Sequence, residues 1–227
     1  MNKEISVLLP GSFFDEGYKI KLEYLSLHNI QCVYLFDHSI NPSDDRKSMY
    51  EIKKAITLIQ ESNKYLFKLG LCVLNINKRK INLLFSEYIN PMLEINNFRL
   101  GFGTGDNKFE KDKLEYSHNL DSIIYDLVNQ YTFSLEGKNL FVGGTSQKKL
   151  DLVKKYSVGV NQWFGDEKTL ISLFDNIGNT KPSLGRISHC QKINKRNSAL
   201  PSNFEQIFVL KDSNTLNFNS QLDKISL

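Results

Sequence analysis

Asp37 and His38 are the first pair in the sequence whose residue types could do acid–base chemistry, and they follow directly on the apolar run Cys32 to Phe36. A histidine changes protonation near neutral pH, so His38 could act as a general acid or base, or donate a hydrogen bond to a ligand carbonyl. A purely structural histidine is the alternative. The remaining histidines have no comparable position and are predicted to be structural or surface residues: His28, His118 and His189.

A second candidate site is the run Gly143-Gly144-Thr145-Ser146, which lies between the apolar run Leu140 to Val142 and a helical pattern. A glycine loop that leads into a helix presents backbone N–H groups and the positive end of the helix dipole to an anion. The run therefore predicts a phosphate site. The alternative is a glycine turn in which Thr145 or Ser146 caps the helix. A Rossmann dinucleotide site fits less well, because the spacing is not GxGxxG and neither glycine stretch follows the first strand.

A third feature is the stretch Phe98 to Glu110 (FRLGFGTGDNKFE), in which Gly101, Gly103 and Gly105 interrupt a strand pattern. Each glycine costs about 0.5–1 kcal/mol in a strand, so bare backbone must be needed there. Close approach of a ligand and tight packing inside a narrow barrel explain the glycines equally well.

Other chemistries lack their signatures in the sequence. No acids and histidines have metal-ligand spacing, and no serine lies in a nucleophile elbow, so metal-dependent and hydrolytic activities rank low. Cys32, Cys72 and Cys190 lie far apart without CxxC spacing, which argues against a disulfide framework or a zinc site and indicates a reducing compartment.

The net charge of +4 arises from 29 basic and 25 acidic residues spread along the chain, so the overall field is weak. Basic clusters occur at Lys78 to Lys80, at Lys148-Lys149 and at Lys192 to Arg196. None is interleaved with aromatic residues, so we interpret them as solvated faces and expect no nucleic-acid partner, although the third could help to hold an anionic ligand. No apolar run approaches the roughly 20 residues that span a bilayer, so a cytoplasmic protein without a membrane partner is expected.

Eight apolar runs alternate with helical patterns, and this order must position the candidate residues. The predicted strands are Ile5 to Leu9, Cys32 to Phe36, Phe67 to Leu74, the glycine stretch, Leu140 to Val142, Val158 to Trp163, Gly185 to Cys190 and Phe204 to Leu210. This βα order predicts a single α/β domain over 1–227, a compact (β/α)8 TIM-like barrel. A doubly wound open sheet is the alternative.

Three local signals refine this prediction. Pro91 is predicted to end or kink the third helix near Asn90. The segment between the last two strands is too polar and short for a full covering helix, which predicts a reduced C-terminal quarter. The Asn- and Ser-rich end, 211–227, is predicted to be a partly loose tail.

In such a barrel the site lies where the strands end, which brings Asp37-His38, Cys72 to Asn75, Thr104 to Asn107, Gly143 to Ser146 and Asn161 to Trp163 to one rim. Four stretches, in this order and spacing, resemble the luciferase-like family of flavin and deazaflavin oxidoreductases, which includes bacterial luciferase. They are VYLFDH (Val33 to His38), KLGLCVL (Lys68 to Leu74), NNFRLGFGTGDNKFE (Asn96 to Glu110) and LFVGGTSQKKLDLVKKYSVGVNQW (Leu140 to Trp163). The resemblance covers Ile5 to Phe174.

The resemblance implies a cofactor, either FMN or an 8-hydroxy-5-deazaflavin of the F-420 type, and roles for individual residues. It makes His38, with Asp37, the catalytic-pocket pair. Cys72-Val73 falls where the family often has a non-prolyl cis peptide behind the flavin. The other implied pocket residues are Asn75 near the ring, Gly103, Thr104 and Gly105 along the pocket wall, Gly143, Gly144, Thr145 and Ser146 around the cofactor phosphate, and Asn161 and Trp163 on the remaining side.

The sequence also departs from the family pattern. Arg99 lies inside the fourth strand, a polar residue often seen after GTG is replaced near Phe109, and Val158 stands where an acid is usual. The family's long excursions after the fourth helix and near the C-terminus, which commonly cover the substrate, are missing.

Three functional hypotheses follow. The first is a luciferase-like oxidoreductase or monooxygenase that transfers hydride or activates oxygen on a small organic substrate, with the chemistry supplied by the cofactor. The second is a non-catalytic flavin-binding barrel that has lost the substrate lid. The third is a barrel that binds another phosphate ester. The oligomeric state stays open, a homodimer being one option.

Overall fold

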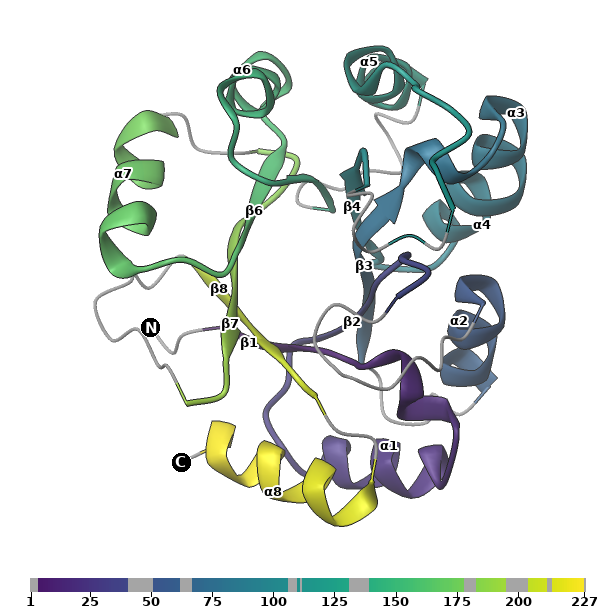
Figure 1. Cartoon of the computed structure of the whole chain (residues 1–227), viewed down its shortest axis with the longest axis vertical. Helices are drawn as coiled ribbons and strands as arrows, with labels where there is room; N and C mark the ends of the chain where they lie inside the picture. Colours follow the sequence, from purple (N-terminus) through teal and green to yellow (C-terminus); the bar gives the residue numbers. More distant parts are fainter. Residues whose placement is uncertain are drawn as a thin grey trace.

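The computed structural model describes residues 4–40, 51–61, 67–105, 110, 112–130, 139–177, 183–194, 204–211 and 214–226. Its eight strands are all parallel and close into a barrel in sequence order, with β8 pairing with β1 (Figure 1). The predicted (β/α)8 barrel is therefore confirmed, and the open sheet is excluded. The strands are β1 (Glu4–Leu8), β2 (Cys32–Leu35), β3 (Lys68–Asn75), β4 (Arg99–Gly103), β5 (Leu140–Gly143), β6 (Gly159–Trp163), β7 (Ile187–Lys192) and β8 (Glu205–Val209).

Helices surround the barrel in Figure 1. They are α1 (Tyr18–Ser26), α2 (Ile52–Glu61), α3 (Ile81–Leu83), a π-helical turn (Leu84–Ile89), α4 (Asn90–Leu93), α5 (Leu120–Gln130), α6 (Gln147–Tyr156), α7 (Glu167–Ile177) and α8 (Thr215–Ser226), with short 3-10 turns at Gly11–Phe14 and Ile76–Lys78. Among the described helices none is long and apolar enough to cross a membrane.

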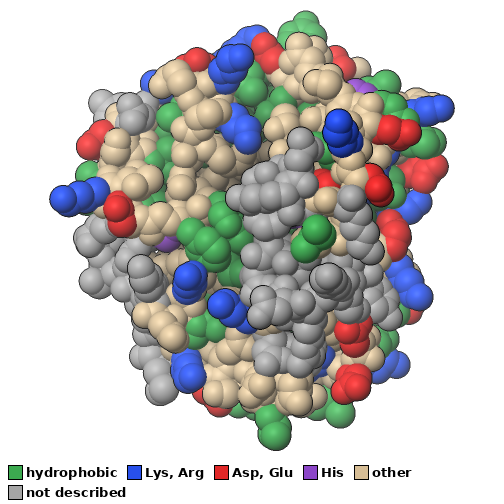
Figure 2. Space-filling model, viewed as in Figure 1, with side chains coloured by type: hydrophobic (Ala, Val, Ile, Leu, Met, Phe, Trp, Pro, Cys, Tyr) green, Lys and Arg blue, Asp and Glu red, His purple; other side chains and the backbone are tan. Residues whose placement is uncertain are grey.

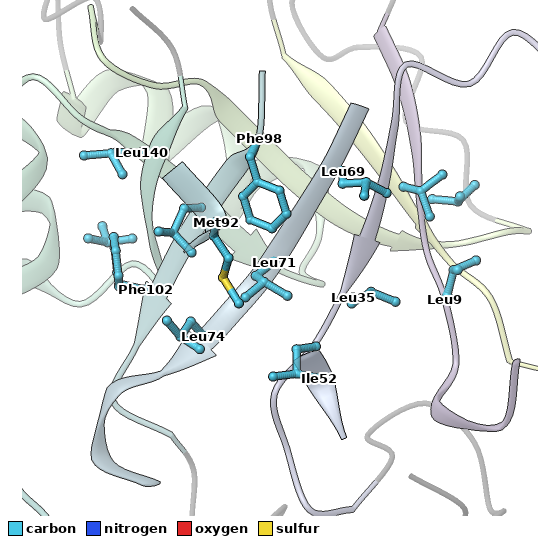
Figure 3. Packing of buried hydrophobic residues seen from close by; sticks show 14 of the residues in the cluster. Leu9, Leu35, Ile52, Leu69, Leu71, Leu74, Met92, Phe98, Phe102 and Leu140 are labelled. Atoms are coloured by element: carbon cyan, nitrogen blue, oxygen red, sulfur yellow. The ribbon is translucent and has the colours of Figure 1, made fainter. Parts of the chain in front are cut away.

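The core has two layers because the side chains of each strand alternate between the two faces of the barrel. The outer layer fills the space between strands and helices, and Figure 3 shows part of it, where Leu71, Met92 and Phe98 lie together. The inner layer fills the barrel itself with Leu8, Cys32, Tyr34, Phe36, Cys72, Phe141, Cys190, Ile207 and Val209.

The glycines of the central stretch make room for these interior side chains. A Cβ on Gly101 would collide with the ring of Phe141, and one on Gly103 would lie 2.5 Å from Cγ2 of Val73. Packing is therefore a sufficient reason for both glycines, whichever ligand the barrel holds.

A buried polar cluster lies at the amino ends of the strands. The carboxylate of Glu205 pairs with the guanidinium of Arg99 and accepts hydrogen bonds from the hydroxyls of Tyr34 (3.0 Å) and Ser6 (2.5 Å). Arg99 and Glu205 are 3% and 2% exposed. Arg99, which departs from the family pattern, is thus one half of a buried ion pair.

One prediction about the helices is wrong, and another is wrong in part. The tail predicted to be loose forms α8, which packs against α1 and buries Phe218, Leu222 and Ile225 at helical spacing. Its Asn and Ser residues lie on the other positions of the helix, so composition concealed the apolar stripe. The prediction that Pro91 ends or kinks the third helix near Asn90 is wrong about the ending, because helical turns continue through Pro91 to Leu93. The geometry does change at this point, from the π-helical turn Leu84–Ile89 to the α-helical turn that begins at Asn90. The predicted lack of a helix between β7 and β8 falls mainly on 195–203, outside the described residues.

Candidate active site

The candidate residues gather at the carboxyl ends of the strands, as the barrel order predicts. Asp37 and His38 follow β2, Asn75 ends β3, Thr104 follows β4, and Gly143 ends β5. Figure 2 shows the molecule in the orientation of Figure 1. On this face, hydrophobic side chains gather near the centre, and Lys and Arg side chains lie close to them.

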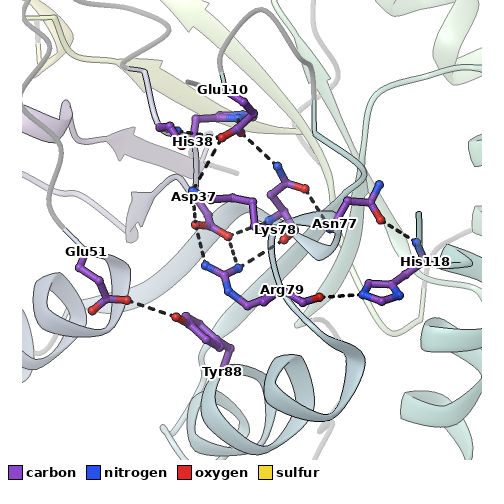
Figure 4. A network of polar contacts seen from close by, with 11 residues as sticks. Asp37, His38, Glu51, Asn77, Lys78, Arg79, Tyr88, Glu110 and His118 are labelled. Carbon is purple, nitrogen blue, oxygen red and sulfur yellow. Dashed lines mark hydrogen bonds and ion pairs between the residues drawn. The ribbon is translucent and has the colours of Figure 1, made fainter. Parts of the chain in front are cut away.

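One contact of the site joins His38 to Glu110, a residue 72 positions further along the chain. Nδ1 of His38 lies 2.9 Å from Oε1 of Glu110, whose side chain is 3% exposed. The same carboxylate accepts hydrogen bonds from the backbone N–H (3.2 Å) and hydroxyl (2.7 Å) of Ser39 and from the amide of Asn75 (3.1 Å). Nζ of Lys78 lies 3.9 Å away (Figure 4).

This environment favours the ionised form of Glu110. Burial pushes the pKa of Glu110 upward, but the hydrogen bonds from His38 and Ser39 and the charge of Lys78 outweigh it, so the pKa falls below its usual value. An ionised carboxylate can only accept hydrogen bonds, so Nδ1 of His38 carries a proton. In the neutral imidazole, Nε2 is then the basic nitrogen.

Asp37 has different partners. Its two carboxylate oxygens accept from the guanidinium of Arg79 at 2.6 and 3.1 Å, and one of them also accepts the backbone N–H of Asn75 at 3.0 Å. Lys78 lies 3.3 Å away. The guanidinium of Arg79 stacks 3.9 Å from the ring centre of Tyr88. Asp37 therefore holds the end of β3 in place.

The prediction that Lys78 to Lys80 form a solvated face is wrong for its first two members. The side chain of Arg79 is 13% exposed, and that of Lys78 is 23% exposed. The 3-10 turn Ile76–Lys78 folds the chain back over the end of β3, which brings both cations to the buried acids Asp37 and Glu110.

The end of β3 has the geometry that the family resemblance implies, because the peptide bond Cys72–Val73 is cis. Sγ of Cys72 points into the barrel, 3.8 Å from Sγ of Cys190, and this contact and burial raise the pKa of the Cys72 thiol. Val73 is half-buried, and its two methyl groups occupy the space that side chains at Gly103 and Gly143 would otherwise fill. Val73 thus fills the floor of the barrel mouth.

Asn75 and Thr104 are held by neighbouring loops. The buried side chain of Asn75 accepts the backbone N–H of Asn77 at 3.1 Å, and Asn77 donates to the carbonyl of Thr104 at 2.9 Å. Gly105 has φ +78°, and a Cβ there would collide with the amide of Asn75. These contacts join the ends of β3 and β4 into one wall.

The run Gly143 to Ser146 forms a separate group between β5 and α6. Gly144 has φ +93° and donates its N–H to the carbonyl of Asn161 at 2.8 Å. Ser146 occupies the N-cap position of α6 but makes no side-chain capping bond, and the hydroxyl of Thr145 donates to Gln162 at 2.6 Å instead. The predicted cap is therefore wrong, because neither Thr145 nor Ser146 caps the start of α6 with its side chain.

The side chain of Asn161 is buried, 2% exposed, and donates to the hydroxyl of Ser188 on the neighbouring strand β7 at 2.9 Å. Its amide also lies 3.4 Å from Sγ of Cys190, the thiol that contacts Cys72. Its contribution to the mouth is the carbonyl that holds Gly144.

Sequence reasoning missed Glu110, Ser39, Lys78 and Arg79 as members of the site. Glu110 closes the glycine stretch, and its acidic type was the one available signal. The expected change at Phe109, with Asp106 and Asn107, lies outside the described residues. Within the part of the chain that the structure describes, no group of three or more His, Cys, Asp or Glu residues could hold a metal ion.

No protein-family model matches the sequence, and a search of curated proteins finds no match. Among solved structures, the fold is similar to an F420-dependent secondary alcohol dehydrogenase in complex with an F420–acetone adduct, with a TM-score of 0.66 at 10% identity over 100% of this chain and 98% of that one. Apo-MsnO8 matches with a TM-score of 0.66 at 9% identity over 99% and 98% of the two chains. The F420-dependent tetrahydromethanopterin reductase from Methanopyrus kandleri matches with 0.59 at 12% identity over 85% and 67%.

At such low identity these likenesses establish the barrel fold alone. A glycoside hydrolase family 5 barrel also matches, with a TM-score of 0.53. Because one barrel can host many reactions, the function must be argued from the residues of the site.

Proposed function

We propose that this chain is a deazaflavin-dependent oxidoreductase with a luciferase-like barrel, acting as a single domain on a small organic substrate. The observation that carries the proposal is the buried His38–Glu110 pair at the barrel mouth. The likeness to two enzymes named as F420-dependent supports a deazaflavin, and FMN is the second cofactor to test.

The residues present fit a flat ring with a phosphate tail. Val73, flanked by Gly103 and Gly143, offers an apolar floor for the ring, and the wall formed by Asn75, Thr104 and Gly105 stands beside it. The tail is assigned to the loop before α6, whose first N–H groups have no side-chain cap. The cofactor residues are therefore Cys72, Val73, Asn75, Gly103, Thr104, Gly105, Gly143, Gly144, Thr145, Ser146 and, through its carbonyl, Asn161.

A bound deazaflavin supplies hydride chemistry, and the chain supplies the proton transfer that must accompany it. In alcohol oxidation, Nε2 of His38 accepts the hydroxyl proton, and Glu110 keeps the Nδ1 proton in place and stabilises the imidazolium that forms. In carbonyl reduction, the same Nε2 returns the proton. Asp37 acts as a positioning residue, since its carboxylate is bonded to Arg79 and to the backbone of Asn75.

One observation favours the second candidate function, a flavin-binding barrel without turnover. Only residues 131–139 separate α5 from β5, so the chain has no long excursion at this point to cover a substrate. Such a protein would bind the cofactor as tightly as an enzyme does.

The test is to incubate the purified chain with F420 or with FMN and then with a panel of alcohols, aldehydes and nicotinamide donors, following cofactor absorbance. We expect F420 to bind and to be reduced by an alcohol in the wild-type chain, while His38→Ala binds F420 but does not reduce it. Binding without turnover by any donor would favour the second function.

A further inference from the structure

Lys149 lies in the first turn of α6, directly above the glycine loop. Its ammonium donates a hydrogen bond to the carbonyl of Gly143, and its side chain is partly buried. No carboxylate among the described residues pairs with it. Lys154 and Lys155 lie in the last turn of the same helix, where a cation is favoured.

The position of Lys149 opposes its charge in two ways. The start of a helix carries positive partial charge, so an ammonium there is repelled by the helix dipole. Burial removes water from the ammonium and lowers the pKa of Lys149. A single carbonyl does not neutralise a cation, whereas Arg79 and Arg99 each bind a carboxylate.

The ammonium of Lys149 lies against the glycine loop, beside Gly144. A Cβ on Gly144 would lie 3.0 Å from Nζ of Lys149, and the residue has φ +93°, which disfavours any other residue type. This loop thus combines two glycines, the ammonium of Lys149, which has no carboxylate partner among the described residues, and a helix start that the side chain of Ser146 does not cap.

We propose that Lys149 is the counter-charge for the cofactor phosphate and makes the site selective for a phosphorylated cofactor over its phosphate-free chromophore. This inference rests on the proposed function, because the phosphate belongs to the cofactor assigned there. On binding, the ammonium exchanges the Gly143 carbonyl for a phosphate oxygen, which forms a charge-assisted hydrogen bond.

The experiment tests whether the effect of replacing Lys149 depends on the phosphate group of the cofactor. Binding of F420 and of phosphate-free 8-hydroxy-5-deazariboflavin is measured by fluorescence titration for wild type, Lys149→Met and the control Lys148→Met, which removes an exposed charge from the neighbouring position. We expect Lys149→Met to weaken F420 binding by roughly tenfold to a hundredfold and to leave the phosphate-free compound unaffected. Lys148→Met should change neither by more than about twofold.

A second readout needs no cofactor. Because an ammonium without a carboxylate partner opposes folding, the apoprotein of Lys149→Met should melt at the same temperature as wild type or higher. Lys149→Gln guards against a packing defect specific to methionine. Equal losses for both compounds, or no loss for either, would overturn the role of Lys149 while leaving the proposed function intact. If wild type bound neither this pair nor FMN and riboflavin, the proposed function would fail and this inference with it.

Discussion

Replacing Glu110 by glutamine tests the site most sharply, because the change keeps the shape of the side chain and removes its charge. Each carboxylate oxygen accepts from named donors, Oε1 from His38 (2.9 Å) and Asn75 (3.1 Å), and Oε2 from Ser39 (2.7 and 3.2 Å). Glutamine has one acceptor oxygen, so its NH2 group must face a donor on one side. The lost bond should lower the free energy of unfolding by about 1–3 kcal/mol.

The effect on turnover should be larger than the effect on stability. Without the carboxylate, Nδ1 of His38 loses its ionised partner, and the tautomer with a basic Nε2 is no longer fixed. General acid–base catalysis contributes roughly 10²–10⁴ in rate, so kcat should fall by about that factor while cofactor affinity changes little.

The stability difference between wild type and Glu110→Gln should depend on pH. Burial raises the pKa of Glu110, but hydrogen bonds from His38 and Ser39 and the charge of Lys78 lower it overall, below the ordinary value of 4.5. A carboxyl with a lowered folded-state pKa stabilises the protein above its unfolded pKa and loses this effect as the pH falls through the folded pKa. The stability difference between wild type and Glu110→Gln should therefore shrink as the pH falls below the ordinary pKa of 4.5 and through the lower pKa of the folded state.

The assay is urea unfolding at several pH values together with steady-state turnover, and Asp112→Asn, an exposed acid shortly after Glu110, is the matched control. The reasoning would be refuted by a Glu110→Gln variant with wild-type kcat, or by a stability difference that grows as the pH falls.

Three further predictions concern the scaffold. Arg99→Met leaves the carboxylate of Glu205 buried without its partner and should lower the free energy of unfolding by about 3–5 kcal/mol. The double variant Arg99→Met with Glu205→Leu should recover much of this loss in urea titrations. Equal stability of the single and double variants would contradict the buried pair. Gly103→Ala places a Cβ 2.5 Å from Val73 and should cost about 1–3 kcal/mol, and Val73→Ala should rescue its melting temperature. A Gly103→Ala variant that melts like wild type but binds no cofactor would instead favour ligand approach as the reason for the glycine. Phe218→Ala in α8 should cost about 3–5 kcal/mol by the same titration, and an unchanged midpoint would argue against docking of the tail.

The sequence predicts the first strands well because they are short, continuous apolar runs that end in turn or polar residues. In β2, for example, all four residues are buried, as in a parallel sheet covered on both faces, and the predicted bounds differ from the observed ones by a single residue. The order of such runs then determines the barrel, and the barrel places His38 and Gly143 at the same end.

The rest of the site depends on contacts between residues far apart in the chain, which no local pattern records. Glu110 follows a strand but has no periodicity that would assign its partner, and the pair it makes with His38 spans 72 positions. Arg79 was misjudged because a run of three basic residues is usually solvated, and burial against Asp37 arises only once the chain turns after β3.

Titration of the purified chain with F420, followed by addition of an alcohol, tests the central proposal most directly. The account predicts saturable binding of one cofactor per chain and reduction of the bound deazaflavin in wild type. In Glu110→Gln it predicts the same binding, with reduction slower by roughly 10²–10⁴. A chain that binds neither F420 nor FMN would contradict it.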